Sequence, residues 1–160
     1  MAQLIGDFVF ARNRDPDHAN FEFAHFLTGT HNEDDSNPNY VDHINLIKVR
    51  MPKLSATEKT TIDYSALDRN SHSKIQIVRK IPHEGEVFKC RQNPLGSEIA
   101  SILTSGVVNV YSAESGNKLG GLVGLAEDSF CLDWNRTKSG LVVSAAGSTV
   151  CIWDIAHHLT

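Results

Sequence analysis

The chain has 160 residues, of which 41% are hydrophobic and 21% are charged, and this balance predicts a folded globular domain and excludes a largely disordered protein. Fifteen basic and nineteen acidic residues give a formal net charge of -4, which disfavours a nucleic-acid groove and is compatible with basic partners. The sequence has no apolar run long enough to span a membrane, and its N-terminus lacks the basic start and apolar stretch of a secretory signal.

The predicted elements are β-strands, because short runs rich in valine, isoleucine and aromatic residues alternate with turn residues. Turn pairs such as Ser105-Gly106 and Gly147-Ser148 separate neighbouring runs, as in antiparallel hairpins. No convincing amphipathic helix of ten residues occurs in the second half, so we expect an all-β fold. The expected strands cover residues 5–11, 21–28, 40–51, 74–81, 87–91, 99–103, 107–111, 119–123, 130–134, 141–144 and 149–153.

Two polar segments interrupt the first half of the chain. Residues 32–39 are acidic and rich in turn formers, and we expect a solvated loop. Residues 52–73 are rich in Ser, Thr, Asp and Asn and hold few large apolar side chains. We expect 52–73 to be a mobile insertion between strands, with room for a short helix around 56–65.

The second half repeats with a period of about forty residues, which is typical of four-stranded propeller blades. One unit begins at His83 and closes on Tyr111, and the next begins at Gly124 and closes on Trp153-Asp154. The closing Trp-Asp pair is the signature dipeptide of the WD repeat. We therefore expect residues 1–160 to form a partial WD-repeat β-propeller, with about two and a half four-stranded antiparallel blades of an expected seven.

Four short stretches in this order resemble the histone-binding WD-repeat family, the retinoblastoma-binding or Nurf-type chromatin subunit. They are HFLTGTH at 25–31, KIPHEGEV at 80–87, LDWN at 132–135 and CIWDI at 151–155. The resemblance implies a non-enzymatic histone-binding scaffold or chaperone that acts in the nucleus, with the cytoplasm as a second location. The implied partners are core histones and subunits of chromatin assembly, acetyltransferase, deacetylase or polycomb complexes, without direct contact to nucleic acid or membrane.

The chain also departs from this family. The family's N-terminal helix, Trp-Pro-Ser segment and last blades have no counterpart in the sequence, and neither does its second histone site. We therefore expect a fragment, an incompletely resolved subunit or a truncated gene product, with a bare strand edge at each end.

The resemblance assigns a histone-tail surface. In the family, acidic residues beside the central channel grip a basic tail, and Glu86 and Asp128 match those positions. Phe130 matches an aromatic residue beside the same surface. Phe88 stands where the family has asparagine, so the resemblance predicts the loss of one hydrogen bond to the tail.

The resemblance also implies a set of blade-locking residues, namely His83, Trp153 and Asp154. In the second unit Leu125 replaces the histidine, and Gly147 replaces the aspartate of the tight turn. We therefore expect the blades to depend more on apolar packing than on a polar network. The two tryptophans, Trp134 and Trp153, are expected in the core rather than as stacking platforms for bases, and so are Phe21, Phe23, Phe26 and Leu27.

Three functional classes stay open at this point. Leu125 and Phe88 depart from the histone-binding pattern and favour, as an alternative, a divergent WD-repeat scaffold for ribosome biogenesis or the kinetochore. The eight histidines raise a metal-dependent hydrolase as a third possibility. However, the sequence lacks Cys-x-x-Cys, His-Glu-x-x-His, Gly-x-Ser-x-Gly and phosphate-loop motifs, so we expect no metal, cofactor or catalytic residue. Three spaced cysteines, Cys90, Cys131 and Cys151, predict buried reduced thiols.

Overall fold

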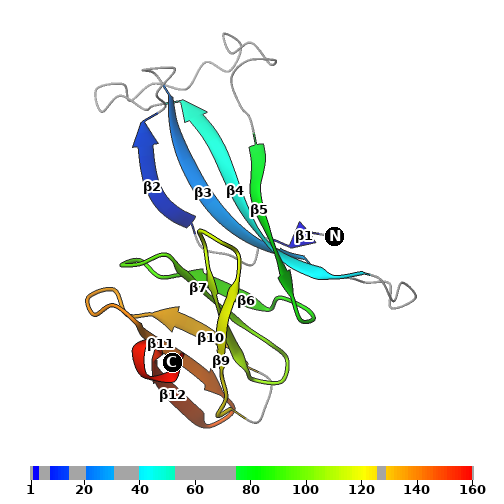
Figure 1. The fold of residues 1–160 in the computed structure, drawn as a ribbon, viewed down its shortest axis with the longest axis vertical. Coiled ribbons are helices and arrows are strands. Elements are labelled where there is room, and N and C mark those ends of the chain that lie inside the picture. Colours follow the sequence, from blue (N-terminus) through cyan, green and yellow to red (C-terminus); the bar gives the residue numbers. More distant parts are fainter. Residues whose placement is uncertain are drawn as a thin grey trace.

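The computed structural model describes residues 2–3, 8–14, 21–30, 40–52, 75–125 and 129–159. Within these ranges the chain forms three antiparallel sheets and one short helix (Figure 1). The predicted all-β fold class is therefore confirmed. The expected loop at 32–39 and the expected insertion at 52–73 lie outside the described residues, apart from Pro52, which ends a strand.

The first sheet, called sheet A, is drawn at the top of Figure 1. In it β3, β4 and β5 form an antiparallel meander, and β1 and β2 both pair with β3 along its other edge. Its strands are β1 (Ala2–Gln3), β2 (Phe8–Arg14), β3 (Phe21–Thr30), β4 (Asp42–Pro52) and β5 (Ile75–His83).

Sheet B is a four-stranded meander in the order β6-β7-β8-β9, and sheet C is a three-stranded meander in the order β10-β11-β12. The strands of sheet B are β6 (Lys89–Gln92), β7 (Glu98–Ile102), β8 (Val108–Ser112) and β9 (Lys118–Leu122). Those of sheet C are β10 (Ser129–Trp134), β11 (Leu141–Ala146) and β12 (Thr149–Asp154), and the helical turn α1 (Ile155–His158) follows.

No helix in the described ranges is long and apolar enough to cross a bilayer.

Two glycine turns set the hairpins where the sequence predicts them. Gly106 has a φ of 80° in the turn between β7 and β8, and Gly147 has a φ of 52° between β11 and β12. Glycine adopts these positive φ angles without the Cβ clash that other residues suffer. Because Gly147 and Ser148 alone separate the paired residues Ala146 and Thr149, this hairpin has a two-residue loop.

Sheet B lies between the other two sheets, so both of its faces are buried. On β8, Val108 and Val110 pack toward sheet C, whereas Tyr111 packs toward sheet A. This arrangement, in which successive meanders stack face to face, is consistent with consecutive propeller blades. The core between sheets A and B contains Leu27, Ile44, Ile81, Val87, Cys90, Ile99 and Tyr111. The core between sheets B and C contains Ala100, Ile102, Val108, Val110, Leu122, Leu132, Trp134, Val142, Trp153 and Ile155.

The predicted core aromatics are only partly confirmed. Trp134 and Trp153 are 4% and 7% exposed, and both lie in the core between sheets B and C. Leu27 is fully buried, whereas Phe23 and Phe26 are only half-buried. The side chain of Phe21 lies outside what the structure describes.

The three cysteines are free thiols, as predicted, but their burial differs. Cys90 is buried between sheets A and B, and Cys151 is half-buried against the core between sheets B and C. The prediction of burial is wrong for Cys131, which is exposed. The reason is strand alternation, since its neighbour Leu132 on β10 points into the core and Cys131 therefore points to the opposite face.

Candidate functional site

The turn from β5 to β6 is held by His83, the last residue of β5. Its side chain is only 3% exposed, and it bonds at both ring nitrogens. Nδ1 lies 2.7 Å from the carbonyl oxygen of Gly85, and Nε2 lies 2.7 Å from Oγ of Ser101 on β7. Because a carbonyl can only accept, Nδ1 carries the proton and Nε2 accepts from the Ser101 hydroxyl. The bond to Ser101 joins sheets A and B at the histidine that the sequence singled out.

A buried polar network extends from His83 into sheet B. Nδ2 of Asn109 donates to the hydroxyl of Tyr111 at 3.3 Å, and Ser101 also hydrogen-bonds with that hydroxyl. Burial lowers the pKa of His83, against the opposing effect of the Gly85 hydrogen bond and nearby carboxylates. Burial likewise raises the pKa of Tyr111. The network is therefore held neutral, and the first unit is more polar inside than the sequence predicted.

The second unit has a Trp153–Ser144 hydrogen bond where the first unit has the His83–Ser101 bond. Ser144 on β11 is buried and accepts a hydrogen bond of 2.8 Å from Nε1 of Trp153. Leu125, which replaces the histidine, is 5% exposed, as an apolar replacement requires. Asp154 caps α1, where its Oδ1 accepts from the backbone N–H of Ala156 at 3.1 Å. This cap satisfies one of the first N–H groups of the helix, which need an acceptor, and the role of Asp154 in locking the blade stays a prediction.

The predicted tail-binding residues fall on two parts of the fold. Glu86 and Phe88 lie in the turn that follows His83, and both are half-buried. Phe88 packs against the core between sheets B and C, which agrees with an aromatic residue in place of asparagine. Phe130 lies at a β-bulge in β10, where the register shifts between Ser129 and Cys131, and its side chain is not described. Asp128 lies outside the described residues, so its position relative to Glu86 stays a prediction.

A hollow of about 380 Å³ lies beside this turn, between sheets A and B. Glu84 and Lys118 form an ion pair of 3.0 Å on its rim. Hydrogen bonding and charge attraction from Lys118 lower the pKa of Glu84. The hollow is lined by Val41, Pro82, His83, Glu84, Tyr111, Gly116, Asn117 and Lys118.

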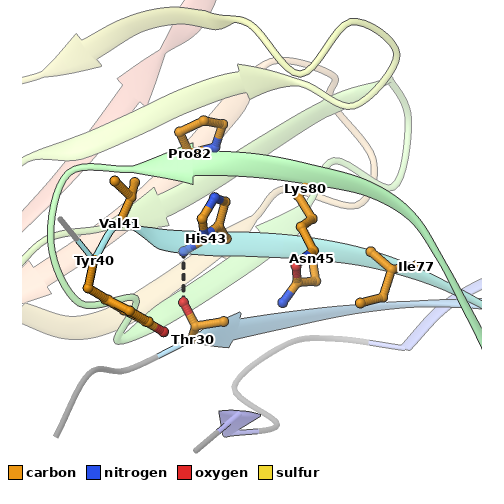
Figure 2. Close-up of a pocket in the computed structure, with 8 residues that line it drawn as sticks. All are labelled: Thr30, Tyr40, Val41, His43, Asn45, Ile77, Lys80 and Pro82. Atoms are coloured by element: carbon orange, nitrogen blue, oxygen red, sulfur yellow. Dashed lines mark hydrogen bonds between the residues drawn. The ribbon is translucent and has the colours of Figure 1, made fainter. Parts of the chain in front are cut away.

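A second hollow, of about 610 Å³, lies on the face of sheet A that points away from sheet B (Figure 2). Asn45 is only 6% exposed there, and its Oδ1 has no hydrogen-bond partner among the residues that the structure describes. Asn45 was not among the site residues predicted from the sequence. The pattern that points to Asn45 is a hydroxyl–asparagine pair that occurs in two sheets. Thr28 pairs with Asn45 across sheet A, and Ser101 pairs with Asn109 across sheet B. The hollow is lined by Thr30, Tyr40, Val41, His43, Asn45, Ile77, Lys80 and Pro82.

The part of the chain that the structure describes contains no set of side chains that could bind a metal ion. There, no three His, Cys, Asp or Glu side chains gather where they could hold an ion. Among the described histidines, His25 lies on β3, His43 on β4 and His83 at the end of β5.

Comparison with known proteins gives two informative relatives. The chain is 28% identical over 162 residues to histone acetyltransferase type B subunit 2 of Gibberella zeae, a match that covers 89% of this chain and 36% of that protein. It is 31% identical over 130 residues to the protein of the same name in Kluyveromyces lactis, covering 76% of this chain and 31% of the relative. The chain thus spans about a third of the length of the curated relatives it matches.

The remaining comparisons add less. No protein-family model matches the sequence. A chain in the crystal structure of the mitotic checkpoint complex superposes with a TM-score of 0.46 at 13% identity, covering 87% of this chain and 45% of that chain.

Proposed function

We propose that this chain is a non-enzymatic histone-binding scaffold that docks a basic histone segment and bridges it to a chromatin assembly or modifying complex in the nucleus. The observation that carries the proposal is the similarity to two histone acetyltransferase type B subunits, at 28% and 31% identity. Its partners are then the core histones and the subunits of such complexes.

The architecture supports a scaffold rather than an enzyme. Sheets A, B and C stack in succession, as units of a partial WD-repeat propeller do, and sheet B packs against both of its neighbours. Such stacked units present loops at their ends as binding surfaces. The turn after β5 is one of these loops, and it carries Glu86.

Glu86 is placed in a turn whose two flanks are fixed. On one side His83 is tied to Ser101 and Gly85, and on the other side the side chain of Val87 is fully buried between sheets A and B. A carboxylate held by anchored neighbours loses little freedom when a lysine or arginine approaches it. Because Glu86 is half-buried, its contact with a cation is screened less than a fully exposed contact would be.

The test is a binding titration with basic histone-tail peptides, followed by fluorescence anisotropy at two salt concentrations. Glu86→Lys and Asp128→Lys are each expected to weaken binding by roughly tenfold, because each brings two like charges together. Glu114→Lys is the matched control, since Glu114 is exposed in the turn after β8 and has the same charge. Unchanged binding by both site variants, or an equal loss in the control, would contradict the site.

A second candidate keeps the scaffold and changes the client. Phe88 fills part of the core between sheets B and C at a position where the histone-binding pattern has asparagine, so its side chain cannot offer the tail an amide. This favours a divergent scaffold for ribosome biogenesis or the kinetochore. Identification of the proteins that copurify with the tagged chain decides between the two, because only the first proposal predicts core histones among them.

A further inference from the structure

The hollow of about 380 Å³ between sheets A and B already holds a positively charged group of the chain itself. Nζ of Lys118, the first residue of β9, lies 3.0 Å from Oε2 of Glu84, which directly follows β5. Both side chains are accessible, since 38% of the Lys118 side chain and 68% of the Glu84 side chain are exposed. An ion pair with this exposure contributes little stability, so an ammonium group from another molecule can take the place of Lys118.

The walls of this hollow suit a long aliphatic side chain that ends in a positive charge. Val41 and Pro82 give the hollow apolar surface, and Val41 is 48% exposed. Tyr111 adds aromatic surface from sheet B. A lysine side chain packs its methylene groups along such apolar surface while its ammonium group stays near water. The carboxylate of Glu84, at the rim of the hollow, is then placed to receive the ammonium group.

Carboxylates lie close together at the turn beside the hollow. Glu84 and Glu86 both belong to this turn, and Asp42 acts electrostatically on the histidine that precedes them. Of the neighbouring cations, Lys118 is paired with Glu84. Arg79 donates instead to a backbone carbonyl in the turn between β8 and β9, at 3.0 Å. This concentration of negative charge attracts a basic segment and repels an acidic one.

We propose that the hollow receives a lysine side chain of the bound basic segment, and that this lysine replaces Lys118 on Glu84. This inference rests on the proposed histone binding, and it names the residue type at one position of the bound segment. Lysine fits better than arginine, because the contact to be replaced is a single one between Nζ and one carboxylate oxygen. The same lysine brings the segment next to Glu86, two residues further along the turn. Acetylation of that lysine removes its charge and therefore abolishes the contact.

Titration of the 160-residue chain with a fluorescent histone-tail peptide tests the exchange. Lys118→Met should bind the peptide about two- to fivefold more tightly, because the internal competitor is gone. Lys138→Met is the matched control, since Lys138 is exposed between β10 and β11 and its replacement removes the same charge. When Glu84→Gln is also present, the gain from Lys118→Met should disappear, because the carboxylate for which the two lysines compete is gone. No gain, an equal gain in the control, or a gain that survives Glu84→Gln would overturn the proposal.

Nuclear magnetic resonance of the Lys118 side chain follows the exchange directly. At saturation with the histone-tail peptide, the Cε–H resonances of Lys118 should move to the values that they have in Glu84→Gln without peptide. The same peptide with every lysine acetylated should leave these resonances unchanged. Displacement of Lys118 by the acetylated peptide, or equal displacement by a peptide with arginine in place of every lysine, would overturn the assignment of the hollow to lysine.

The same measurement separates this proposal from the proposed function. If Lys118 stays paired with Glu84 while the histone peptide is bound, the lysine site is wrong and histone binding stands. If a lysine-containing peptide of unrelated sequence displaces Lys118 and binds as tightly as the histone peptide, the lysine site stands and the preference for histones is wrong. If neither peptide binds, both proposals are overturned.

Discussion

Ser101 and His83 are joined by a hydrogen bond of 2.7 Å between Oγ and Nε2, although one belongs to sheet B and the other ends sheet A. Both side chains are buried, at 0% and 3% exposure. The bond therefore fastens two stacked sheets through a polar contact that water does not reach. It also fixes the start of the turn that carries Glu86. The same hydrogen bond therefore stabilises both the packing of the two sheets and the candidate binding surface.

Loss of the serine hydroxyl should destabilise the fold. Ser101→Ala leaves Nε2 of His83 buried without its donor, and an unsatisfied buried group of this kind costs about 1–3 kcal/mol. The free energy of unfolding, measured with urea, should fall by that amount. Ser139→Ala is the matched control, since Ser139 is exposed in a turn and its loss should change the free energy by less than about 0.5 kcal/mol. Equal stability of the two variants would contradict the role of the bond.

Stability should fall in mild acid because of His83. Burial lowers the pKa of His83 in the folded state below the ordinary histidine value of about 6.5, so the unfolded chain binds the proton more readily. The stability that neutral His83 contributes is complete above about pH 6.5, and it is lost as the pH falls from there through the lower pKa of the folded state. The pKa of His25 is also lowered, by burial and by Lys48, and adds a loss in the same direction.

A substitution separates the two histidines. His83→Gln removes one titrating group, so its free energy of unfolding should fall less than that of the wild type between pH 7.5 and pH 5.5. His157→Gln is the control, because His157 is exposed on α1. If His83→Gln loses as much stability between pH 7.5 and pH 5.5 as the wild type does, another group is responsible for the loss.

The strands were predictable because turn residues mark their ends. Gly106 and Gly147 stand in hairpin turns that need positive φ, and they fix the strands on either side of them. The observed strands mostly begin and end within two residues of the expected ranges. The exceptions are β1, Ala2–Gln3, where no strand was expected, and β2, Phe8–Arg14, which begins and ends three residues later than predicted. The apolar run of β2 does not mark its ends, since the strand continues through the polar residues Asn13 and Arg14.

The facing of side chains was less predictable. In β8 the four residues from Val108 to Tyr111 are all buried, because sheets lie on both sides, so no polar alternation marks the two faces. At Phe130 a bulge adds a residue and reverses the alternation beyond it. Neither effect leaves a sequence signal in a single chain.

Only one partner of the hydrogen bond between His83 and Ser101 carries a sequence signal. His83 stands in the motif that the resemblance supplied, whereas Ser101 is an ordinary serine 18 residues further along the chain. Asn45 was not predicted for a similar reason. Its cross-strand neighbour Thr28 and its counterpart Asn109 are recognised only once the register of the strands is known. Long-range pairing, rather than local sequence, creates both buried polar sites.

Trp153 should contribute through its N–H group as well as its ring. Trp153→Phe removes the donor of the 2.8 Å bond to Ser144 and leaves space in the core between sheets B and C. The expected loss is about 1–3 kcal/mol in the free energy of unfolding. Val123→Ala serves as the control, because Val123 is 74% exposed and its truncation should cost less than about 0.5 kcal/mol. A loss no larger than that of the control would refute the structural role of the indole.

The cap of α1 gives the most selective prediction, because two substitutions at one position should differ. Oδ1 of Asp154 accepts from the N–H of Ala156 at 3.1 Å, and Ile155, the first residue of the helix, is buried in the core between sheets B and C. Asp154→Ala removes the acceptor and should cost about 0.5–2 kcal/mol, whereas Asp154→Asn keeps an acceptor and should cost far less. Urea unfolding of the three proteins measures the difference. Equal losses for alanine and asparagine would show that the charge of Asp154, rather than its hydrogen bond, stabilises the end of sheet C.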